Sequence, residues 1–163
     1  METRLALQMA EELAASPDEP AFYLPYAADF RGRVYSLVPH LCPTGGSFAR
    51  SLMQFHRGHA LGPDGLFWLK VQLANSFGWG KLSLNERVKR VDQNLANIRA
   101  SATDPIGMPC TGLNATSSWW RTADNPWLCL AACFEVHAAL QHAEKKGGDG
   151  GGCEDFISHL PVM

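Results

Sequence analysis

The heptapeptide DFRGRVY, residues Asp29 to Tyr35, is the stretch from which the interpretation of this chain begins. Side chains alternate between the two faces of a β-strand, so a strand here places Arg31, Arg33 and Tyr35 on one face. Gly32 separates the arginines and leaves room for another backbone or a phosphate to approach. Two guanidinium groups, an aromatic ring and a bare backbone suit contact with a sugar-phosphate chain. The alternative is an ordinary strand whose arginines pair with surface carboxylates.

Longer blocks accompany this heptapeptide, which itself follows the apolar run AFYLPY. In chain order they are GHALGPDGLFWLKVQLANSFG (58–78), the ER pair of NERVKR (85–90), the DP pair of ATDPI (102–106), WWRTADNPWLCLAACFE (119–135) and SHLPV (158–162). Their order and approximate spacing resemble the motifs of the bacteriophage-type single-subunit RNA polymerases, which also serve mitochondria and plastids. Several long, tryptophan-rich blocks in register are far more specific than one short pattern, and the resemblance covers nearly the whole chain.

Length and composition limit the class of protein independently. A chain of 163 residues with 46% hydrophobic content buries one core. Its net charge of −2 means that any contact with nucleic acid must come from a local cluster of cations. Five cysteines, an odd number, argue against a disulfide framework and for a reducing compartment. No apolar run approaches the roughly 20 residues that span a bilayer, so no membrane association is predicted.

Periodicity predicts an α+β chain that is predominantly helical. The expected helices run over 2–16, from a Ser47 cap to Gly58, from Pro63 to Gly78, from a Ser83–Glu86 capping box to Ala102, and from an Asp124 cap to about His142. The proline-rich stretch 17–20 ends the first helix, and Asp104-Pro105 ends the fourth. Residues 107–118 are expected to form a loop insertion, and residues 145–152 a flexible link.

The same patterns predict which individual side chains are buried and which are exposed. Trp68 lies in so apolar a helix that we predict it to be part of the core. The loop that follows this helix is expected to expose Trp79 and Lys81. The polar face of the capping-box helix is interpreted as solvated, and it carries Arg87, Lys89, Arg90 and Arg99.

No catalytic or metal-binding group is predicted in this chain. Cys129, Cys133 and His137 stand at i, i+4 and i+8 of one helix, a span of about 12 Å that cannot converge on one tetrahedral ion. The two cysteines are therefore interpreted as buried small residues. Asp29 is a candidate general base, yet its place beside two arginines favours a permanently ionised partner that supports the motif.

The resemblance implies roles for particular positions. Arg31, Gly32, Arg33 and Tyr35 match the family's DxxGR element, which in relatives lies against the template strand and the RNA–DNA hybrid near the active site. The family therefore implies nucleic-acid binding by all four residues of this element.

Two further cations match the family outside that element. Arg50 matches a basic position on the next helix that approaches the template backbone. Lys81 matches a lysine close to the phosphates of the incoming nucleotide, although GWGK lacks the acidic residue that usually precedes this lysine. The double tryptophan and the Pro126 helix are expected to be structural.

The resemblance also implies a right-hand polymerase fold, a cofactor and a compartment. Residues 1–20 would be the end of a thumb-like helix with its linker, and residues 21–163 the first part of the palm. The family's two Mg²⁺ ions are held by aspartates, the first in a DGxCxG motif just beyond the SHLPV-like segment. We therefore expect a fragment, ending at Met163 before that motif, that binds no metal and is inactive alone.

The expected partners are a DNA template, the RNA–DNA hybrid and nucleoside triphosphates, with organellar transcription factors possible. The expected compartment is the mitochondrion, or alternatively the plastid. The acidic amino terminus is unlike a signal or transit peptide, so a targeting segment is expected to be missing. The alternative functions are a non-catalytic nucleic-acid-binding or regulatory helical protein derived from the polymerase, and a degenerate product without function.

Overall fold

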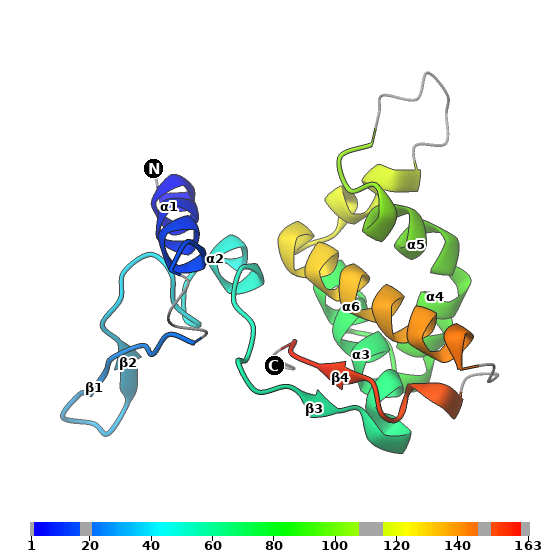
Figure 1. Cartoon of the computed structure of the whole chain (residues 1–163), viewed down its shortest axis with the longest axis horizontal. Helices are drawn as coiled ribbons and strands as arrows, with labels where there is room; N and C mark the ends of the chain where they lie inside the picture. Colours follow the sequence, from blue (N-terminus) through cyan, green and yellow to red (C-terminus); the bar gives the residue numbers. More distant parts are fainter. Residues whose placement is uncertain (1, 17–20, 108–115, 147–150, 161–163) are drawn as a thin grey trace. The chain divides into compact units, whose positions relative to one another are not determined.

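A computed structural model gives the structure of residues 2–16, 21–107, 116–146 and 151–160. The chain forms two compact units, residues 1–56 and 57–163, each with its own core, so the prediction of a single core is wrong. It is α+β and mostly helical, as the sequence predicts (Figure 1). The division at residue 20 between thumb-like and palm-like parts stays a prediction.

In its described residues, the first unit contains two helices and one hairpin. Helix α1 (Glu2–Ala14) packs against the short helix α2 (Ser47–Ser51), and strands β1 (Tyr26–Ala28) and β2 (Val34–Ser36) pair with each other. Its small core consists of buried Ala6, Leu41 and Ala49, with other side chains partly buried around them. This confirms the helix predicted over the first residues, whose inward stripe includes Ala6.

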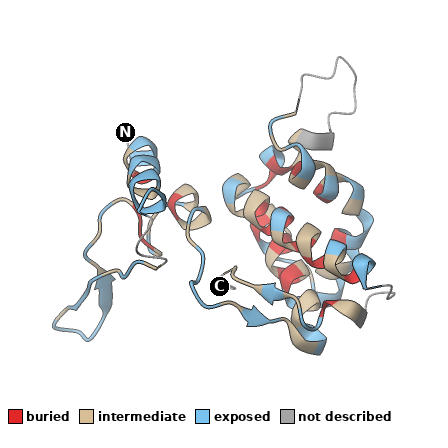
Figure 2. Ribbon diagram, in the orientation of Figure 1, coloured by how far each residue is buried: buried red, intermediate tan, exposed pale blue. Residues whose placement is uncertain are grey.

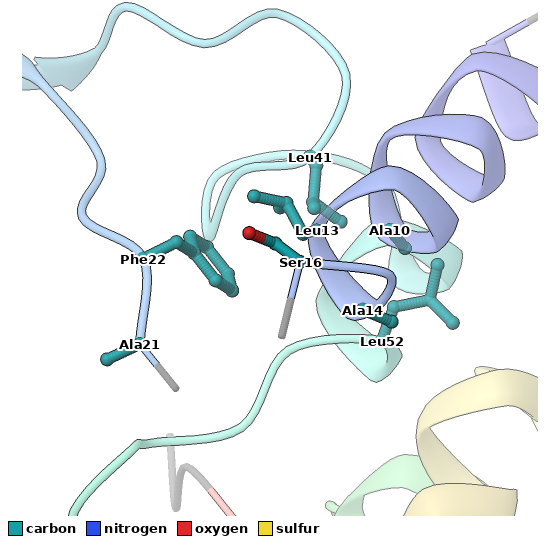
Figure 3. A pocket seen from close by; sticks show the side chains of 8 residues that line it. All are labelled: Ala10, Leu13, Ala14, Ser16, Ala21, Phe22, Leu41 and Leu52. Atoms are coloured by element: carbon teal, nitrogen blue, oxygen red, sulfur yellow. The ribbon is translucent and has the colours of Figure 1, made fainter. Parts of the chain in front are cut away.

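A pocket of about 280 Å³ lies within this unit, beside α1. Figure 3 shows its lining side chains, with Phe22 pointing toward the end of α1. They are Ala10, Leu13, Ala14, Ser16, Ala21, Phe22, Leu41 and Leu52. The lining side chains are apolar except for the hydroxyl of Ser16.

The second predicted helix is shorter than the sequence suggested. Gly46, rather than Ser47, is the N-cap of α2, and no side chain caps it. The Met53 amide donates to the Arg50 carbonyl three residues back at 3.3 Å, which tightens the last turn and ends the helix. Arg57 consequently lies outside this helix.

The second unit is a helical core with a two-stranded ribbon. Its described α-helices are α3 (Gly62–Phe77), α4 (Leu84–Gln93), α5 (Leu95–Thr103) and α6 (Pro126–Lys145). The 3₁₀ helix η1 (Thr116–Thr122) precedes α6, and η2 (Gly151–Cys153) follows it. Strand β3 (His59–Ala60) pairs antiparallel with β4 (Ile157–Ser158). Figure 2 shows the buried residues concentrated where α3 and α6 meet.

Both ends of α3 follow their sequence signals. Pro63 and Asp64 occupy the first turn, and Gly78 ends the helix with a left-handed φ of +115°. The prediction that Trp68 is buried is wrong, because 47% of this residue is exposed. Buried Leu69 and Leu73 define the inward stripe, and Trp68 lies beside that stripe with its ring edge against Phe67.

Trp79, predicted to be exposed, is partly buried against the core. Its ring lies 4.4 Å from that of Phe77 and 6.2 Å from that of Trp119, measured between centroids. Phe77 in turn stacks on Trp119 at 4.3 Å. Phe77 at the end of α3 and Trp119 on η1 thus keep the Trp79 ring turned toward the core. Lys81 is exposed, as predicted.

The capping box is confirmed, but the helix it begins is interrupted. The Ser83 hydroxyl accepts from the Glu86 amide, and the Glu86 carboxylate accepts from the Ser83 amide. Helix α4 ends at Gln93, and α5 begins after Asn94, whose side-chain amide donates to the Arg90 carbonyl at 2.8 Å. That bond competes with the helical repeat and separates the predicted single helix into two.

Helix α6 starts and ends differently from the prediction. Its N-cap is Asn125 rather than Asp124, and it continues to Lys145. The Asp124 and Asn125 amides donate to the carbonyls of Phe77 and Ser76 at 3.1 and 3.0 Å. The start of α6 is therefore joined to the end of α3 by backbone hydrogen bonds.

The two cysteines of α6 are buried, which confirms their interpretation as core residues. A hydrogen bond with Cys129, together with burial, raises the pKa of the Cys133 thiol well above its usual range. Within the described ranges, no group of three or more His, Cys, Asp or Glu side chains could hold a metal ion. None of the described helices is both long and apolar enough to cross a bilayer.

Several expectations lie outside the described residues. They concern the break at 17–20, most of the 107–118 loop, the centre of the 145–152 link and the last three residues of the chain. Within the described part, residues 116–118 belong to η1, and residue 145 is still helical.

Gly78→Ala should destabilise the chain, because alanine is strained at a φ of +115° and its Cβ would lie 2.4 Å from Asp124 Oδ2. We expect the free energy of unfolding, measured by urea denaturation, to fall by about 1–3 kcal/mol. Gly80→Ala is the matched control in the same loop, since an added Cβ there meets nothing within 4 Å. Equal losses in both variants would contradict this account of the helix end.

Candidate nucleic-acid interface

The DFRGRVY residues form the tip and one arm of a hairpin, rather than one continuous strand. Tyr26 pairs with Ser36, Ala27 with Tyr35, and Ala28 with Val34. Residues 29–33 are consequently the connecting loop, so the predicted strand over 29–35 is wrong in its first five residues. The loop forms because one carboxylate and one glycine support a tight reversal of the chain.

Asp29 supplies that carboxylate. Its Oδ1 accepts from the backbone amides of Arg31 and Arg33 at 2.8 and 3.0 Å, and its Oδ2 accepts from the Arg31 guanidinium at 2.9 and 3.0 Å. The Asp29 amide also donates to the Arg33 carbonyl at 2.8 Å. These bonds, led by the one from the Arg33 amide, lower the pKa of Asp29 below its ordinary value. The carboxylate thus shapes the loop while ionised.

Gly32 completes the turn with a left-handed φ of +77°, and its amide donates to the Asp29 carbonyl at 3.0 Å. A Cβ at this position would meet nothing within 4 Å. The left-handed backbone, rather than a lack of space, is therefore the reason for a glycine here, and the space beside it stays open.

The two arginines of the loop differ in availability. The Arg31 guanidinium is paired with Asp29, and it lies 5.5 Å from the centre of the Phe30 ring. The Arg33 side chain is exposed and has no hydrogen-bond or ion-pair partner among the described residues. Of the two, Arg33 is the guanidinium free to bind a phosphate.

Exposed aromatic residues lie in the same hairpin and in the segment that leads into it. Phe30, at the tip, is 97% exposed, and Tyr35 is 44% exposed. Tyr23 and Tyr26, on the arm that leads into β1, are exposed as well. The sequence interpretation singled out Tyr35 but missed Phe30, whose place between Asp29 and Arg31 in the motif was the available signal.

Arg50 lies on α2, a different element of the same unit. Its Nε is buried and has no hydrogen-bond partner among the described residues. An arginine side chain stays charged in proteins, so a donor of this kind gains from any acceptor that reaches it. Arg50 is less accessible than Arg33, since its side chain is partly covered.

Lys81 lies in the second unit, in the loop between α3 and α4. The exposed ammonium has no partner among the described residues. The same loop is held by Arg87, whose guanidinium donates to the carbonyls of Leu82 and Gly80 at 2.8 and 2.5 Å and to Asn75 Oδ1 at 2.9 Å. Arg87 was predicted to be solvated, and this is wrong because its donors are used within the protein.

The structure therefore groups Arg31, Gly32, Arg33 and Tyr35 in one hairpin, with Asp29 as their organising carboxylate. Arg50 belongs to the same unit, and Lys81 belongs to the other. The hairpin combines one free guanidinium, exposed rings and an open glycine, which can bind phosphate oxygens and stack on bases.

Comparisons with known proteins match this arrangement to one family. A family model described as DNA-dependent RNA polymerase matches residues 59–163. The chain is 40% identical over 151 residues to the mitochondrial DNA-directed RNA polymerase of Neurospora crassa, an alignment that covers 93% of this chain and 10% of that protein. It is 36% identical over 163 residues to the chloroplastic/mitochondrial DNA-directed RNA polymerase 2 of Arabidopsis thaliana, covering 99% of this chain and 14% of the relative.

A third relative, the mitochondrial DNA-directed RNA polymerase of Schizosaccharomyces pombe, is 39% identical over 152 residues. The alignment covers 93% of this chain and 12% of that protein. The chain thus spans between 10 and 14% of the length of these three curated relatives.

The hairpin loop should become less stable at acidic pH, because the Asp29 carboxylate that organises it is then protonated. A carboxylate whose pKa is lowered by folding stabilises the loop at all pH values above its ordinary pKa of 3.8, and this stabilisation is lost as the pH falls through the lower folded pKa. In an NMR titration, we expect the Arg31 and Arg33 amide resonances to shift together below pH 3.8.

The Leu37 amide, which donates to the Pro25 carbonyl, is the control within the hairpin and should hold its position. Asp29→Asn should remove the pH-dependent shift. A midpoint at or above the ordinary carboxyl pKa would contradict the hydrogen-bonded loop.

Proposed function

Because the chain belongs to the DNA-dependent RNA polymerase family of the single-subunit bacteriophage type, we propose that it is a segment of a polymerase that synthesises RNA from nucleoside triphosphates on a DNA template. Within that enzyme the segment holds the template strand and the RNA–DNA hybrid through its hairpin. It corresponds to the junction between thumb and palm and to the first part of the palm.

One observation carries this proposal: an exposed hairpin presents a free guanidinium, at Arg33, beside exposed aromatic rings. Asp29 neutralises Arg31 and fixes the backbone on both sides of Gly32, so the loop is organised before any ligand binds. A preorganised loop loses less conformational entropy on binding. A guanidinium that contacts phosphates binds the backbone of a nucleic acid irrespective of its sequence, as a transcribing enzyme requires.

A second contact is proposed at Lys81, for the phosphates of the incoming nucleotide. Its ammonium is exposed and has no partner among the described residues, so no internal ion pair must be broken before it binds. Arg50 contributes a further contact to the template backbone in this proposal, through the partly covered guanidinium on α2.

The family implies Mg²⁺ in the complete enzyme, where it would stabilise the attacking and leaving oxygens of nucleotidyl transfer. Across the described residues, no cluster of acidic, histidine or cysteine side chains could hold such an ion. The proposed role of this segment is binding and positioning.

We place the enzyme in an organelle, because relatives of the chain are described as mitochondrial and chloroplastic polymerases. The mitochondrion is the proposed compartment, with the plastid as alternative. Organellar transcription factors are the further partners of such an enzyme.

The proposal can be tested in a chimera in which this chain replaces the matching segment of the Neurospora crassa mitochondrial polymerase. Arg33→Ala should shorten the lifetime of stalled elongation complexes, since one phosphate contact is lost. The slope of log lifetime against log salt should change by about one unit, while misincorporation stays unchanged. Arg33→Lys should restore part of the lifetime, because it keeps the charge but not the two-pronged fork.

Arg99→Ala is the matched control, since Arg99 is engaged in a surface ion pair with Glu144 at 2.5 Å. This variant should leave complex lifetimes at the level of the unsubstituted chimera. Lifetimes that are equal for Arg33→Ala and the unsubstituted chimera at every salt concentration would refute the proposed contact.

A further inference from the structure

Arg87 is the most highly connected side chain around the Lys81 loop. Its Nε donates to the Leu82 carbonyl at 2.8 Å, and its Nη2 donates to the Gly80 carbonyl at 2.5 Å. Its Nη1 reaches Asn75 Oδ1 on α3 at 2.9 Å. One planar group on α4 thus joins both sides of Lys81 to the preceding helix.

The carbonyls that Arg87 binds belong to the residues immediately before and after Lys81. Fixing both fixes the backbone of Lys81 itself, although its side chain is free. Among the described residues, one other hydrogen bond spans Lys81, from the Leu82 amide to the Trp79 carbonyl at 3.0 Å. Without Arg87, this loop would retain a single bond across the lysine.

The two helices that the Arg87 guanidinium connects, α4 and α3, are themselves held in place. The capping box at Ser83 and Glu86 fixes the first turn of α4, and Glu86 is adjacent to Arg87 in the chain. Asn75 belongs to α3, whose end is joined to α6 through the Ser76 and Phe77 carbonyls. The position of the loop is therefore fixed relative to the core of the second unit.

We infer that Arg87 is a positioning residue, which holds the backbone of Lys81 where the lysine ammonium can reach the phosphates of a nucleoside triphosphate. The inference rests on the proposed role of Lys81. Arg87 directs one donor from each of its three guanidinium nitrogens to an acceptor within the protein, so the group is held against the loop. It acts through the loop, and its charge is not the property that matters.

Lysine at position 87 separates charge from geometry. Arg87→Lys keeps the positive charge but offers one ammonium in place of a planar fork, so it cannot bind both carbonyls and Asn75 in the same way. Arg87→Gln removes the charge and most of the donors. If the fork is what matters, the two variants behave alike.

The first experiment uses the 163-residue chain and needs no nucleotide. Amide hydrogen exchange at Leu82 should accelerate about tenfold or more in Arg87→Lys and in Arg87→Gln, because the loop loses its external bonds. The Ile98 amide of α5, which donates to the Asn94 carbonyl, should keep its exchange rate. This control shows that the fold is intact. Unchanged exchange at Leu82 in both variants would overturn the inference.

The second experiment measures nucleotide use in the chimera with the Neurospora crassa polymerase. Lys81→Ala should raise the KM for nucleoside triphosphates by about tenfold, and Arg87→Lys should raise it by a similar factor, with kcat changed less. The double variant should be no worse than Lys81→Ala alone, because Arg87 acts only through that lysine. Lys89→Gln, which removes an exposed charge from the same helix, should leave the KM unchanged.

The outcomes separate the two claims. If Lys81→Ala leaves KM unchanged, the proposed function of Lys81 fails, whatever Arg87 does. If Lys81→Ala raises KM but Arg87→Lys does not, or if their effects multiply in the double variant, Lys81 keeps its role and the positioning role of Arg87 is wrong.

Discussion

The packing of α3 against α6 is the interaction on which the second unit depends. Leu69 and Leu73 of α3 are buried in the same core as Cys129 and Val136 of α6. Apolar contact alone would allow the two helices to slide, but the hydrogen bonds from the start of α6 to the last carbonyls of α3 fix their register. Gly78 then turns the chain away from α3 with a left-handed backbone, and this sets where the Lys81 loop begins.

The first unit relies on a different kind of constraint. Its hairpin buries little, so the shape of the loop comes from hydrogen bonds to the Asp29 carboxylate rather than from a core. This arrangement leaves Phe30 and Tyr35 in solvent, which is unfavourable for apolar surface unless a partner covers it. In the proposed function a nucleic acid would meet both features, because phosphates can bind a free guanidinium and bases can stack on exposed rings.

Local signals predicted much of the helical structure. The end of α3 at Gly78, its start at Pro63 and the Ser83–Glu86 capping box depend on neighbours within a few residues, and all three are found in the structure. The family was also predictable, because long blocks of sequence carry it.

Contacts between distant elements were not predictable from one sequence. Trp68 is exposed because the helices that pack on α3 contact a neighbouring stripe, and Arg87 is engaged because Asn75 of another helix faces it. The break at Asn94 and the loop at 29–33 each depend on a side chain that bonds to its own backbone neighbourhood. Such bonds compete closely with regular structure, so composition and period alone do not decide between them.

The central claim is that this segment contacts nucleic acid through its hairpin and nucleotide through its α3–α4 loop. The most direct measurement is a cryo-electron microscopy structure of the chimeric polymerase, stalled on a template with a non-hydrolysable nucleoside triphosphate. The account predicts the Arg33 guanidinium within roughly 3 Å of a backbone phosphate of the template or hybrid, and the Lys81 ammonium at a similar distance from a nucleotide phosphate. A structure in which the hairpin faces solvent or protein, and Lys81 lies away from the nucleotide, would contradict it.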